Sequence, residues 1–179
     1  SCHSTKEIIS TDSSVVDSKI TEAIAIAEPA IIYKNGTLSA QIKTLLCHKQ
    51  KEELSLSIIN LNSEEKLLIS FDDLEAGIKD YYYTIIHCNA DWTASDLMQS
   101  EYISGFTDEP ITNYEFSFNT LQKYTHYSFE FPTEQIKPML SGNYVFKIFE
   151  EEEEEEGNAI AYKRFMVLET KLTIEAQVR

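Results

Sequence analysis

The sequence predicts an all-β protein built as an antiparallel β-sandwich, and two observations support this fold class. Apolar and polar residues alternate with a period of two in NYEFSFN (113–119) and HYSFEFP (126–132), as they do along a half-buried strand. Short runs rich in aromatic and β-branched residues also recur along the chain, at spacings typical of sandwiches and barrels. At 179 residues the chain is expected to form one domain with a sizeable core.

The expected strands follow in order along the chain. Each is a short run in which aromatic or branched side chains dominate, and together they number about nine or ten. Pro132 ends one of them, and Pro110 precedes another, because proline cannot donate to a ladder hydrogen bond. The runs are IIYKNG (31–36), IKTLLCHK (42–49), SIINLN (57–62), LLISFDDL (67–74), YYYTIIHCN (81–89), NYEFSFN (113–119), HYSFEFP (126–132), NYVFKIF (143–149) and YKRFMVL (162–168).

Alternation within these runs predicts which side chains face the interior of the sandwich. Residues two apart point to the same face of a sheet, so the apolar members of each run form the core. The residues expected inside are Ile85, Phe116, Phe118, Tyr127, Phe129, Phe146 and Phe165.

Helix is expected only as single turns. SDLM (95–98) and TEQIKPML (133–140) are each long enough for one turn, with Ser95 and Thr133 as suitable N-caps.

One spacing narrows the fold class to an immunoglobulin-like or fibronectin III-like sandwich. Leu121, Thr125 and Tyr127 fit the pattern L-x-x-x-T-x-Y, with which many such sandwiches begin a strand. In that arrangement the tyrosine bends back and its hydroxyl bonds a backbone group a few residues upstream. We therefore expect Tyr127 to be buried, with its hydroxyl bonded near residues 121–123.

The N-terminal residues 1–25 are expected to form a flexible tail, and residues 26–179 the sandwich domain. The tail is rich in Ser and Thr and carries Cys2 near its start, as a mature bacterial lipoprotein does with its acylated cysteine and tether. Cys2 is therefore a candidate lipidation site, and the alternative is a trimmed chain end. Cys2, Cys47 and Cys88 make an odd number and fit no disulfide framework.

Charge excludes some partners. The formal net charge is −15, so the protein is expected to repel nucleic acid and anionic lipid, and to meet a membrane only through a lipid anchor. No apolar run reaches the length of a transmembrane helix. The glutamate run at 150–156 separates two strand patterns and is expected to be a mobile, solvated hairpin tip. A cation site there is the weaker alternative, since calcium loops alternate their ligands with glycines and carbonyls.

The stretch YYYTIIHCNADW (81–92) raises the question of catalysis, because it brings together nucleophile, base and acid types. Adjacent residues of a strand point to opposite faces, so the pairs Cys47–His48 and His87–Cys88 are poorly placed to share a zinc ion. Cys88 ends an apolar run in an acidic chain, which favours a buried, inert thiol over a nucleophile. His87 and Cys88 are thus expected to be structural.

Carboxylates and phosphate loops give no stronger signal. Asp72 and Asp73 are adjacent and expected to point apart, and aspartates after a strand commonly cap turns. The chain has five glycines and no glycine-rich phosphate loop. The sequence therefore predicts a protein that is not an enzyme and that holds no cofactor and no metal.

The segment from Asp91 to Phe106 is the candidate interface. Asp91, Trp92, Tyr102 and Phe106 combine anchor-type aromatic side chains with polar neighbours. The alternative is that these aromatic side chains plug the end of the sandwich, and Trp92 in particular is expected to pack against the sheet.

Several segments, taken together, resemble a known family. They follow in this order: LLISFDDL (67–74), IHCNADW (86–92), SEYISGF (100–106), PITNYEFSFNTL (110–121), YTHYSFEFP (124–132), LSGNYVFKIFE (140–150) and RFMVLE (164–169). The chain from about residue 30 onward resembles the N-terminal region of the plug-protein family of the type IX secretion system in Bacteroidota.

This resemblance implies an immunoglobulin-like N-terminal domain of a larger protein, followed by a C-terminal domain that this chain lacks. It implies a location at the periplasmic face of the outer membrane, where the plug closes the mouth of a barrel translocon when no cargo is present. The expected partners are that outer-membrane barrel and the protein's own C-terminal domain. The family brings no catalytic residues with it. The alternative function is a carbohydrate-binding or accessory sandwich of an envelope lipoprotein.

Overall fold

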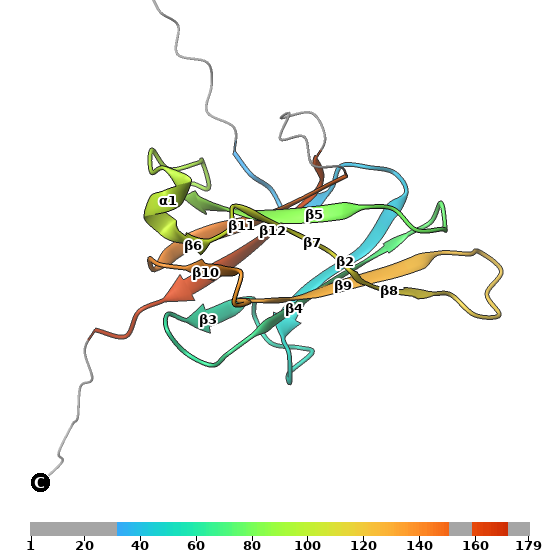
Figure 1. Ribbon diagram of the computed structural model, residues 1–179, viewed down its shortest axis with the longest axis horizontal. Helices are drawn as coiled ribbons and strands as arrows, with labels where there is room; N and C mark the ends of the chain where they lie inside the picture. The colour runs from blue at the N-terminus through green and yellow to red at the C-terminus, as the bar shows by residue number, and fades with distance from the viewer. Residues whose placement is uncertain (1–31, 151–158, 172–179) are drawn as a thin grey trace, which may run out of the picture.

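The computed structural model describes residues 32–150 and 159–171 (Figure 1). The expected tail at 1–25 with its candidate lipidation site Cys2 lies outside the described residues. So does the glutamate run beyond Glu150, together with the end of the chain from residue 172.

The all-β prediction is confirmed, because the described residues form twelve strands and one short helix. In chain order these are β1 (Gly36–Thr37), β2 (Ile42–Lys49), β3 (Ile58–Asn60), β4 (Leu67–Asp73), β5 (Tyr81–Cys88), α1 (Gln99–Tyr102), β6 (Ile103–Gly105), β7 (Asp108–Pro110), β8 (Asn113–Phe116), β9 (Thr125–Phe131), β10 (Ile136–Pro138), β11 (Gly142–Glu150) and β12 (Ala159–Leu168).

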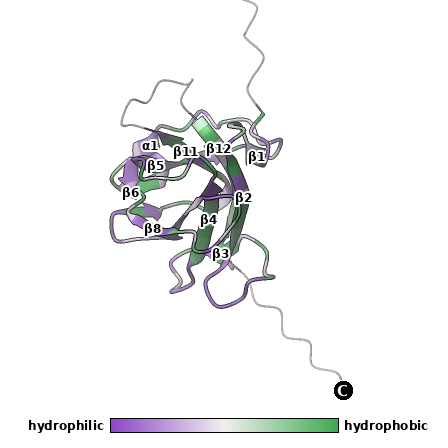
Figure 2. Cartoon of the chain, turned by 90° about the vertical axis from the view of Figure 1, so that its right-hand side faces the viewer, coloured by the Kyte–Doolittle hydropathy of each residue, from purple (hydrophilic) through white to green (hydrophobic). Residues whose placement is uncertain are grey.

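Two sheets make up the body of the fold. One has the order β1-β12-β11-β5-β7, with β3 added in parallel to the end of β12, and the other has the order β2-β4-β9-β8. The pairings within these two orders are antiparallel. A small third sheet, β10-β6, lies beside α1 at one end (Figure 1). In the side view of Figure 2, β4 and β12 show long green stretches, since both strands supply apolar side chains to the interior.

Alternation along the strands builds the core. Burial in β9 switches at every residue, so that Tyr127 and Phe129 point inward while Ser128 and Glu130 do not. Tyr83 of one sheet stacks on Phe129 of the other with ring centroids 4.1 Å apart. Such aromatic pairs add about 0.5–1.5 kcal/mol beyond the area that they bury. The predicted core residues Ile85, Tyr127, Phe129, Phe146 and Phe165 are all buried.

The prediction was wrong for the other two core residues. Phe116 is 58% exposed and Phe118 is 93% exposed. Phe116 lies on the inner face of β8, but β8 is the edge strand of its sheet, and Phe118 lies beyond the end of β8. The facing sheet ends at β7, and the β8–β9 hairpin extends past it, as the right-hand side of Figure 1 shows. No strand of the described residues therefore covers this face.

The tyrosine corner also differs from the prediction. Tyr127 is fully buried, but its hydroxyl accepts the N–H of Lys79 at 2.9 Å, in the connection between β4 and β5. Thr125 makes a parallel contact, donating its hydroxyl to the Gly77 carbonyl at 2.7 Å. Leu121 is fully exposed at the hairpin tip. The β4–β5 connection crosses from one sheet to the other directly over Tyr127. The hydroxyl therefore bonds this connection and not residues 121–123.

The two expected single turns are placed differently in the structure. The helix is α1, and its N-cap is Met98, whose N–H donates to the Glu101 carboxylate at 2.7 Å. Ser95 is bonded instead to the ring of His87. After Thr133 the chain makes only a turn, in which the Thr133 hydroxyl accepts two backbone N–H groups, before it enters β10.

Tyr127→Phe is expected to lower the free energy of unfolding by about 1 kcal/mol, because the Lys79 N–H loses its acceptor in a buried place. Urea denaturation measures this loss. The matched control is Tyr114→Phe, at a neighbouring ring whose hydroxyl has no partner in the described residues and which is 37% exposed. That control is expected to change stability by less than about 0.5 kcal/mol. Equal losses in both variants would contradict the proposed role of the Tyr127 hydroxyl.

Candidate partner-binding surface

The chain leaves β5 through a corner, residues 89–95, that is held by its own hydrogen bonds. Asp91 accepts the Thr93 hydroxyl at 2.7 Å and the Thr93 N–H at 3.1 Å, and these bonds lower the pKa of its carboxyl. Asn89 donates its side-chain amide to the Thr93 hydroxyl and to the Ala94 carbonyl, both at 3.1 Å. Trp92 has a φ of 68°, in the left-handed region. Asp91 is therefore a turn-forming residue, as aspartates after a strand commonly are.

Trp92 packs on the outer face of the large sheet. The guanidinium carbon of Arg164 lies 4.3 Å from the centroid of the indole ring, in cation–π geometry. Arg164 also donates its Nε–H to the Tyr33 carbonyl at 2.7 Å, and the Tyr33 N–H donates to the Trp92 carbonyl at 3.0 Å. Trp92 is thus half-buried between the segment before β1 and the strand β12, and packs against the sheet without entering the core between the two sheets.

Tyr102 is buried at the end of the sandwich, beside His87. The imidazole of His87 lies 5.0 Å from the ring of Tyr144 and 5.8 Å from that of Tyr102, measured between centroids. Its Nδ1 is bonded to the Ser95 hydroxyl at 2.9 Å. Burial lowers the pKa of His87, while a backbone hydrogen bond with Ser141 opposes that shift. Tyr102 and His87 therefore act as packing residues.

Gly142 leaves room for this histidine. Its φ is 153°, and a Cβ at this position would lie 2.6 Å from the His87 Nε2. The close approach of β11 to the imidazole therefore depends on the missing side chain.

Phe106 is the one aromatic side chain of the predicted interface that is free at the surface. It follows β6 and is 65% exposed, while its backbone N–H is fixed to the Gln135 carbonyl at 2.8 Å. The predicted interface thus separates into a turn residue, a half-buried indole, a buried plug and a single exposed ring.

The two described cysteines lie in different sheets. Cys47 on β2 and Cys88 on β5 are both buried and free, and burial raises the pKa of each thiol to about 11. Asp72 and Asp73 point to opposite faces of β4. Asp72 pairs with His126 at 2.7 Å, and the buried Asp73 accepts the Tyr81 hydroxyl at 3.0 Å. Across residues 32–150 and 159–171, no three or more His, Cys, Asp or Glu side chains gather as a metal site.

The sequence analysis missed a second exposed apolar surface, which we name the hairpin patch. It is made of Tyr114, Phe116, Phe118 and Leu121 on the β8–β9 hairpin, and all four side chains are exposed. Phe118 and Leu121 flank the turn at Asn119, whose φ is 55°. Two apolar residues beside a polar turn are the sequence signal that could have indicated a projecting tip.

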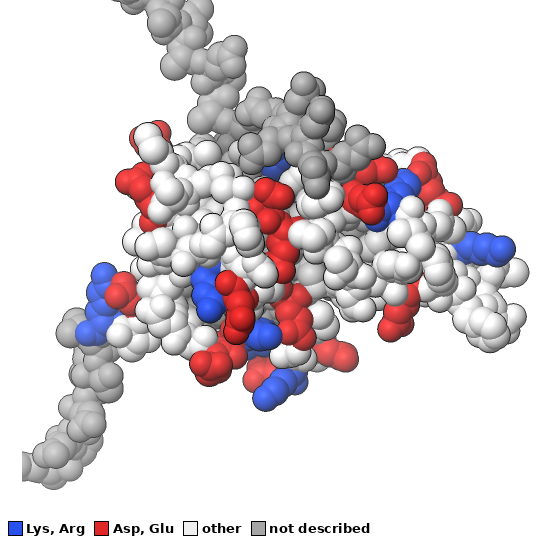
Figure 3. Space-filling model, in the orientation of Figure 1, with Lys and Arg blue, Asp and Glu red and all other residues white. Residues whose placement is uncertain are grey.

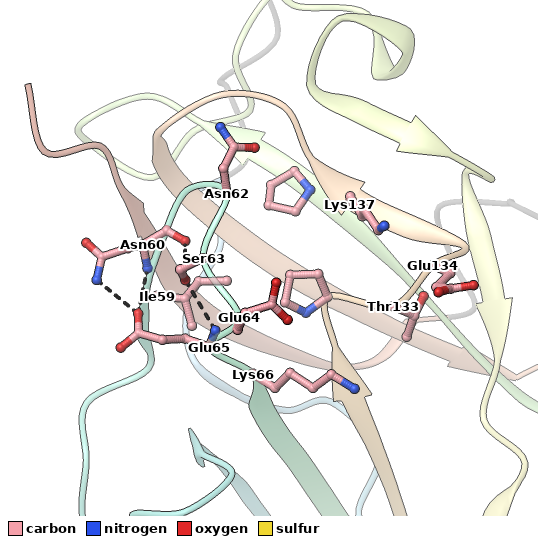
Figure 4. Close-up of a pocket in the computed structure, with 12 residues that line it drawn as sticks. Ile59, Asn60, Asn62, Ser63, Glu64, Glu65, Lys66, Thr133, Glu134 and Lys137 are labelled. Atoms are coloured by element: carbon pink, nitrogen blue, oxygen red, sulfur yellow. Dashed lines mark hydrogen bonds between the residues drawn. The ribbon is translucent and has the colours of Figure 1, made fainter.

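A polar groove of about 580 Å³ lies between the turn after β3 and the turn after β9 (Figure 4). Glu65 is bonded to Lys49 and to the Asn60 N–H, and Lys66 pairs with Glu130 at 2.9 Å. Pro132 and Pro138 supply apolar surface, but no aromatic side chain lines the groove. On the face seen in Figure 1, acidic side chains are spread over the surface with basic side chains among them (Figure 3).

These features define a β-sandwich domain whose distinctive surface groups are exposed aromatic side chains. The chain belongs to the family described as type 9 secretion system plug protein, first domain, whose model matches residues 42–169. This match confirms the resemblance found in the sequence. Among the described helices, none is long and apolar enough to cross a membrane.

One solved structure supports the fold. A hypothetical protein from Parabacteroides merdae superposes with a TM-score of 0.72 at 33% identity, over 77% of this chain and 34% of that one. The chain therefore spans about a third of the length of this relative. Two more distant structures are an alkylpurine DNA glycosylase from Pseudomonas fluorescens bound to DNA and a Niemann-Pick type C2 protein from the Japanese carpenter ant. Both are 14% identical: the glycosylase has a TM-score of 0.33 over 71% of this chain and 30% of its own, and the ant protein 0.38 over 78% and 99%. No curated protein matches.

Cys47 and Cys88 are expected to react slowly with a thiol reagent in the native state. With a pKa of about 11, roughly one thiol in ten thousand is ionised at pH 7, and both are buried as well. The measurement is labelling of a Cys2→Ser variant, with and without denaturant. Fast labelling of Cys88 without denaturant would contradict its structural assignment.

Arg164→Ala is expected to lower the free energy of unfolding by about 1–2 kcal/mol, because it removes the cation–π contact and the bond to Tyr33. Trp92 is the only tryptophan in the sequence, so its emission should shift to the red as the indole meets water. Arg164→Lys keeps the charge without the planar group and should recover only part of the loss. Lys123→Ala, at an exposed lysine, is the control. Unchanged emission in Arg164→Ala would show that the arginine does not shield the ring.

Proposed function

We propose that this chain is a non-catalytic interaction domain of the cell envelope that contributes to type IX secretion. It acts at the periplasmic face of the outer membrane, where it binds a barrel translocon and helps to close its mouth. The observation on which this rests is the match of residues 42–169 to the first domain of the plug family. That family is named for a secretion component and not for a reaction, which supports a binding role.

The side chains that could have suggested catalysis have structural tasks. The thiols of Cys47 and Cys88 are buried, Asp91 closes a turn, and Asp73 is bonded to a buried tyrosine. His87 is partly buried and bonded to Ser95. Each of these groups contributes to packing or to a turn, which supports assignment of the domain as a binding module.

The partner surface includes the segment from Asp91 to Phe106, with Phe106 as its anchor. An exposed aromatic ring on a backbone that is fixed by hydrogen bonds loses little conformational entropy on binding. Asp91, Trp92 and Tyr102 fix the shape of this segment. Asp91 closes the turn, Trp92 packs on Arg164, and Tyr102 is buried at the end of the sandwich. The solved relative is about three times as long as the matching region. We therefore propose that a C-terminal domain of the same protein is a second partner.

The alternative function, carbohydrate binding, finds no specific support. Sugar-binding grooves offer flat aromatic rings, and the groove between the turns after β3 and β9 has none. The exposed rings of Tyr114 and Phe116 meet at 66° and form no common plane. The immunoglobulin-like topology and the acylation of Cys2 remain predictions, and both agree with an anchored envelope domain.

Phe106→Ser is expected to reduce recovery of the barrel translocon about tenfold when the full-length protein is used as bait in envelope extract. Its unfolding free energy should change by less than about 0.5 kcal/mol, because the ring is exposed. Leu54→Ser is the matched control, an exposed apolar residue outside the segment. Tyr102→Ala should instead lose about 3–5 kcal/mol of stability, as a buried plug does. Translocon recovery that is equal for Phe106→Ser and wild type would remove this segment from the interface. Absence of the translocon from the wild-type pull-down would overturn the proposed function.

A further inference from the structure

The strand β8 has an open edge. It pairs with β9 and with no other strand of the described residues, and all four of its side chains are exposed. The Ser117 N–H donates to the Tyr124 carbonyl at 2.9 Å, so residues 117 and 124 form a hydrogen-bonded pair. In an antiparallel ladder such pairs alternate, which directs the N–H and C=O groups of Tyr114 and Phe116 away from β9. These backbone groups are available to another strand.

The other edge strand of the same sheet, β2, is protected. It begins with a register shift between Lys43 and Leu46, where Thr44 adopts a φ of 52°, and such bulges disrupt further pairing. Its lysines, Lys43 and Lys49, add charge along the strand. In β8 there is no bulge, no lysine and no proline. The sheet thus has one edge that is closed to pairing and one that is open.

Charge on the outer face of this sheet specifies what would pair with β8. Glu115 lies beside His126, which lies beside Asp72, and His126 and Asp72 are bonded at 2.7 Å. The Glu115 carboxylate has no ion-pair partner in the described residues. A basic side chain on a neighbouring strand would stand directly opposite it, where opposite charges are stabilising.

Apolar surface on the inner face gives the second requirement. The rings of Tyr114 and Phe116 lie on the inner face of β8 and are exposed to solvent. The hairpin patch continues from them through Phe118 to Leu121. A strand added to β8 would lay its alternate side chains over these rings. The hairpin lies at the opposite end of the sandwich from the end of β12 (Figure 1), so this site is separate from the place where the described chain stops.

We propose that the edge of β8 binds an extended strand of a partner protein, in which one basic residue stands between two apolar residues. The backbone of Tyr114 and Phe116 supplies the hydrogen bonds, Glu115 pairs with the basic residue, and the hairpin patch covers the apolar ones. This is recognition by strand addition, in which the main chain provides affinity and alternate side chains provide specificity. The proposal rests on the proposed function, because it names the kind of segment that an envelope partner would offer.

The test uses the whole 179-residue chain and two synthetic peptides, STVKVTS and STVEVTS, followed by amide NMR and hydrogen exchange. We expect STVKVTS to shift and protect the amides of Tyr114 and Phe116, and to bind about fivefold more tightly than STVEVTS. Glu115→Lys should reverse this preference. Phe116→Pro should abolish binding of both peptides, since it removes an edge donor that β9 does not use, and Leu54→Ser should leave binding unchanged.

Three results would overturn the proposal: perturbations confined to residues outside β8, equal affinity for the two peptides, or protection of the same amides at high protein concentration without peptide. The last would identify a second copy of the chain as the occupant. Glu115 is exposed, so Glu115→Lys is expected to fold normally. The reversed preference of this variant therefore tests the proposal even if Phe116→Pro fails to fold. Loss of peptide binding together with normal recovery of the translocon would reject the β8 edge alone and leave the proposed function standing.

Discussion

The packing of aromatic rings between two sheets is the constraint on which this domain depends. Tyr83 and Phe129 stack across the interior at 4.1 Å, and Phe131 meets Phe146 edge-on at 5.0 Å. Rings of this size fill the space between sheets only if every strand keeps its register, because a slip of one residue would turn them to solvent. The long antiparallel ladders β11–β12 and β11–β5 fix that register. The rest of the fold is arranged around this interior.

The polar groups inside the domain follow from the same constraint. Tyr81, Tyr127 and Tyr144 bury rings with hydroxyl groups, and each hydroxyl must find a partner once water is excluded. Their partners are the Asp73 carboxylate, the Lys79 N–H and the Leu140 carbonyl. No buried side-chain nitrogen or oxygen of the described residues lacks a partner. The chain connections are therefore tied to the core through tyrosine hydroxyls, which fixes the crossover between the sheets and the turn into β11.

The aromatic side chains at the surface of the domain fall into two groups, those that stabilise the fold and those that remain exposed. The corner after β5 is stitched to the outer face of the large sheet through Trp92 and Arg164, so its aromatic group stabilises the domain. The β8–β9 hairpin extends beyond the facing sheet, so its aromatic side chains have no interior to enter. Exposed apolar groups on a rigid, hydrogen-bonded hairpin are a typical feature of binding surfaces. The proposed binding role would use such a surface.

The sequence by itself determined the longer strands, since a period of two is a local property that each segment carries alone, whereas the short strands β6, β7 and β10 were not predicted. It also determined that Tyr127 is buried, that Asp72 and Asp73 point apart, and that Cys47 and Cys88 are buried, because these follow from alternation and apolar neighbours. Only the tertiary structure decided which apolar face packs against the opposite sheet. Phe116 and Phe129 have the same local pattern of alternation. Phe129 faces the second sheet and is buried, whereas Phe116 has no strand of the described residues opposite it and is exposed. Likewise, the partner of the Tyr127 hydroxyl is 48 residues away and that of Trp92 lies on β12, and pairings over such distances depend on how the sheets are stacked. Alternation defines two faces for every strand, and the arrangement of the sheets in space selects the one that becomes the core.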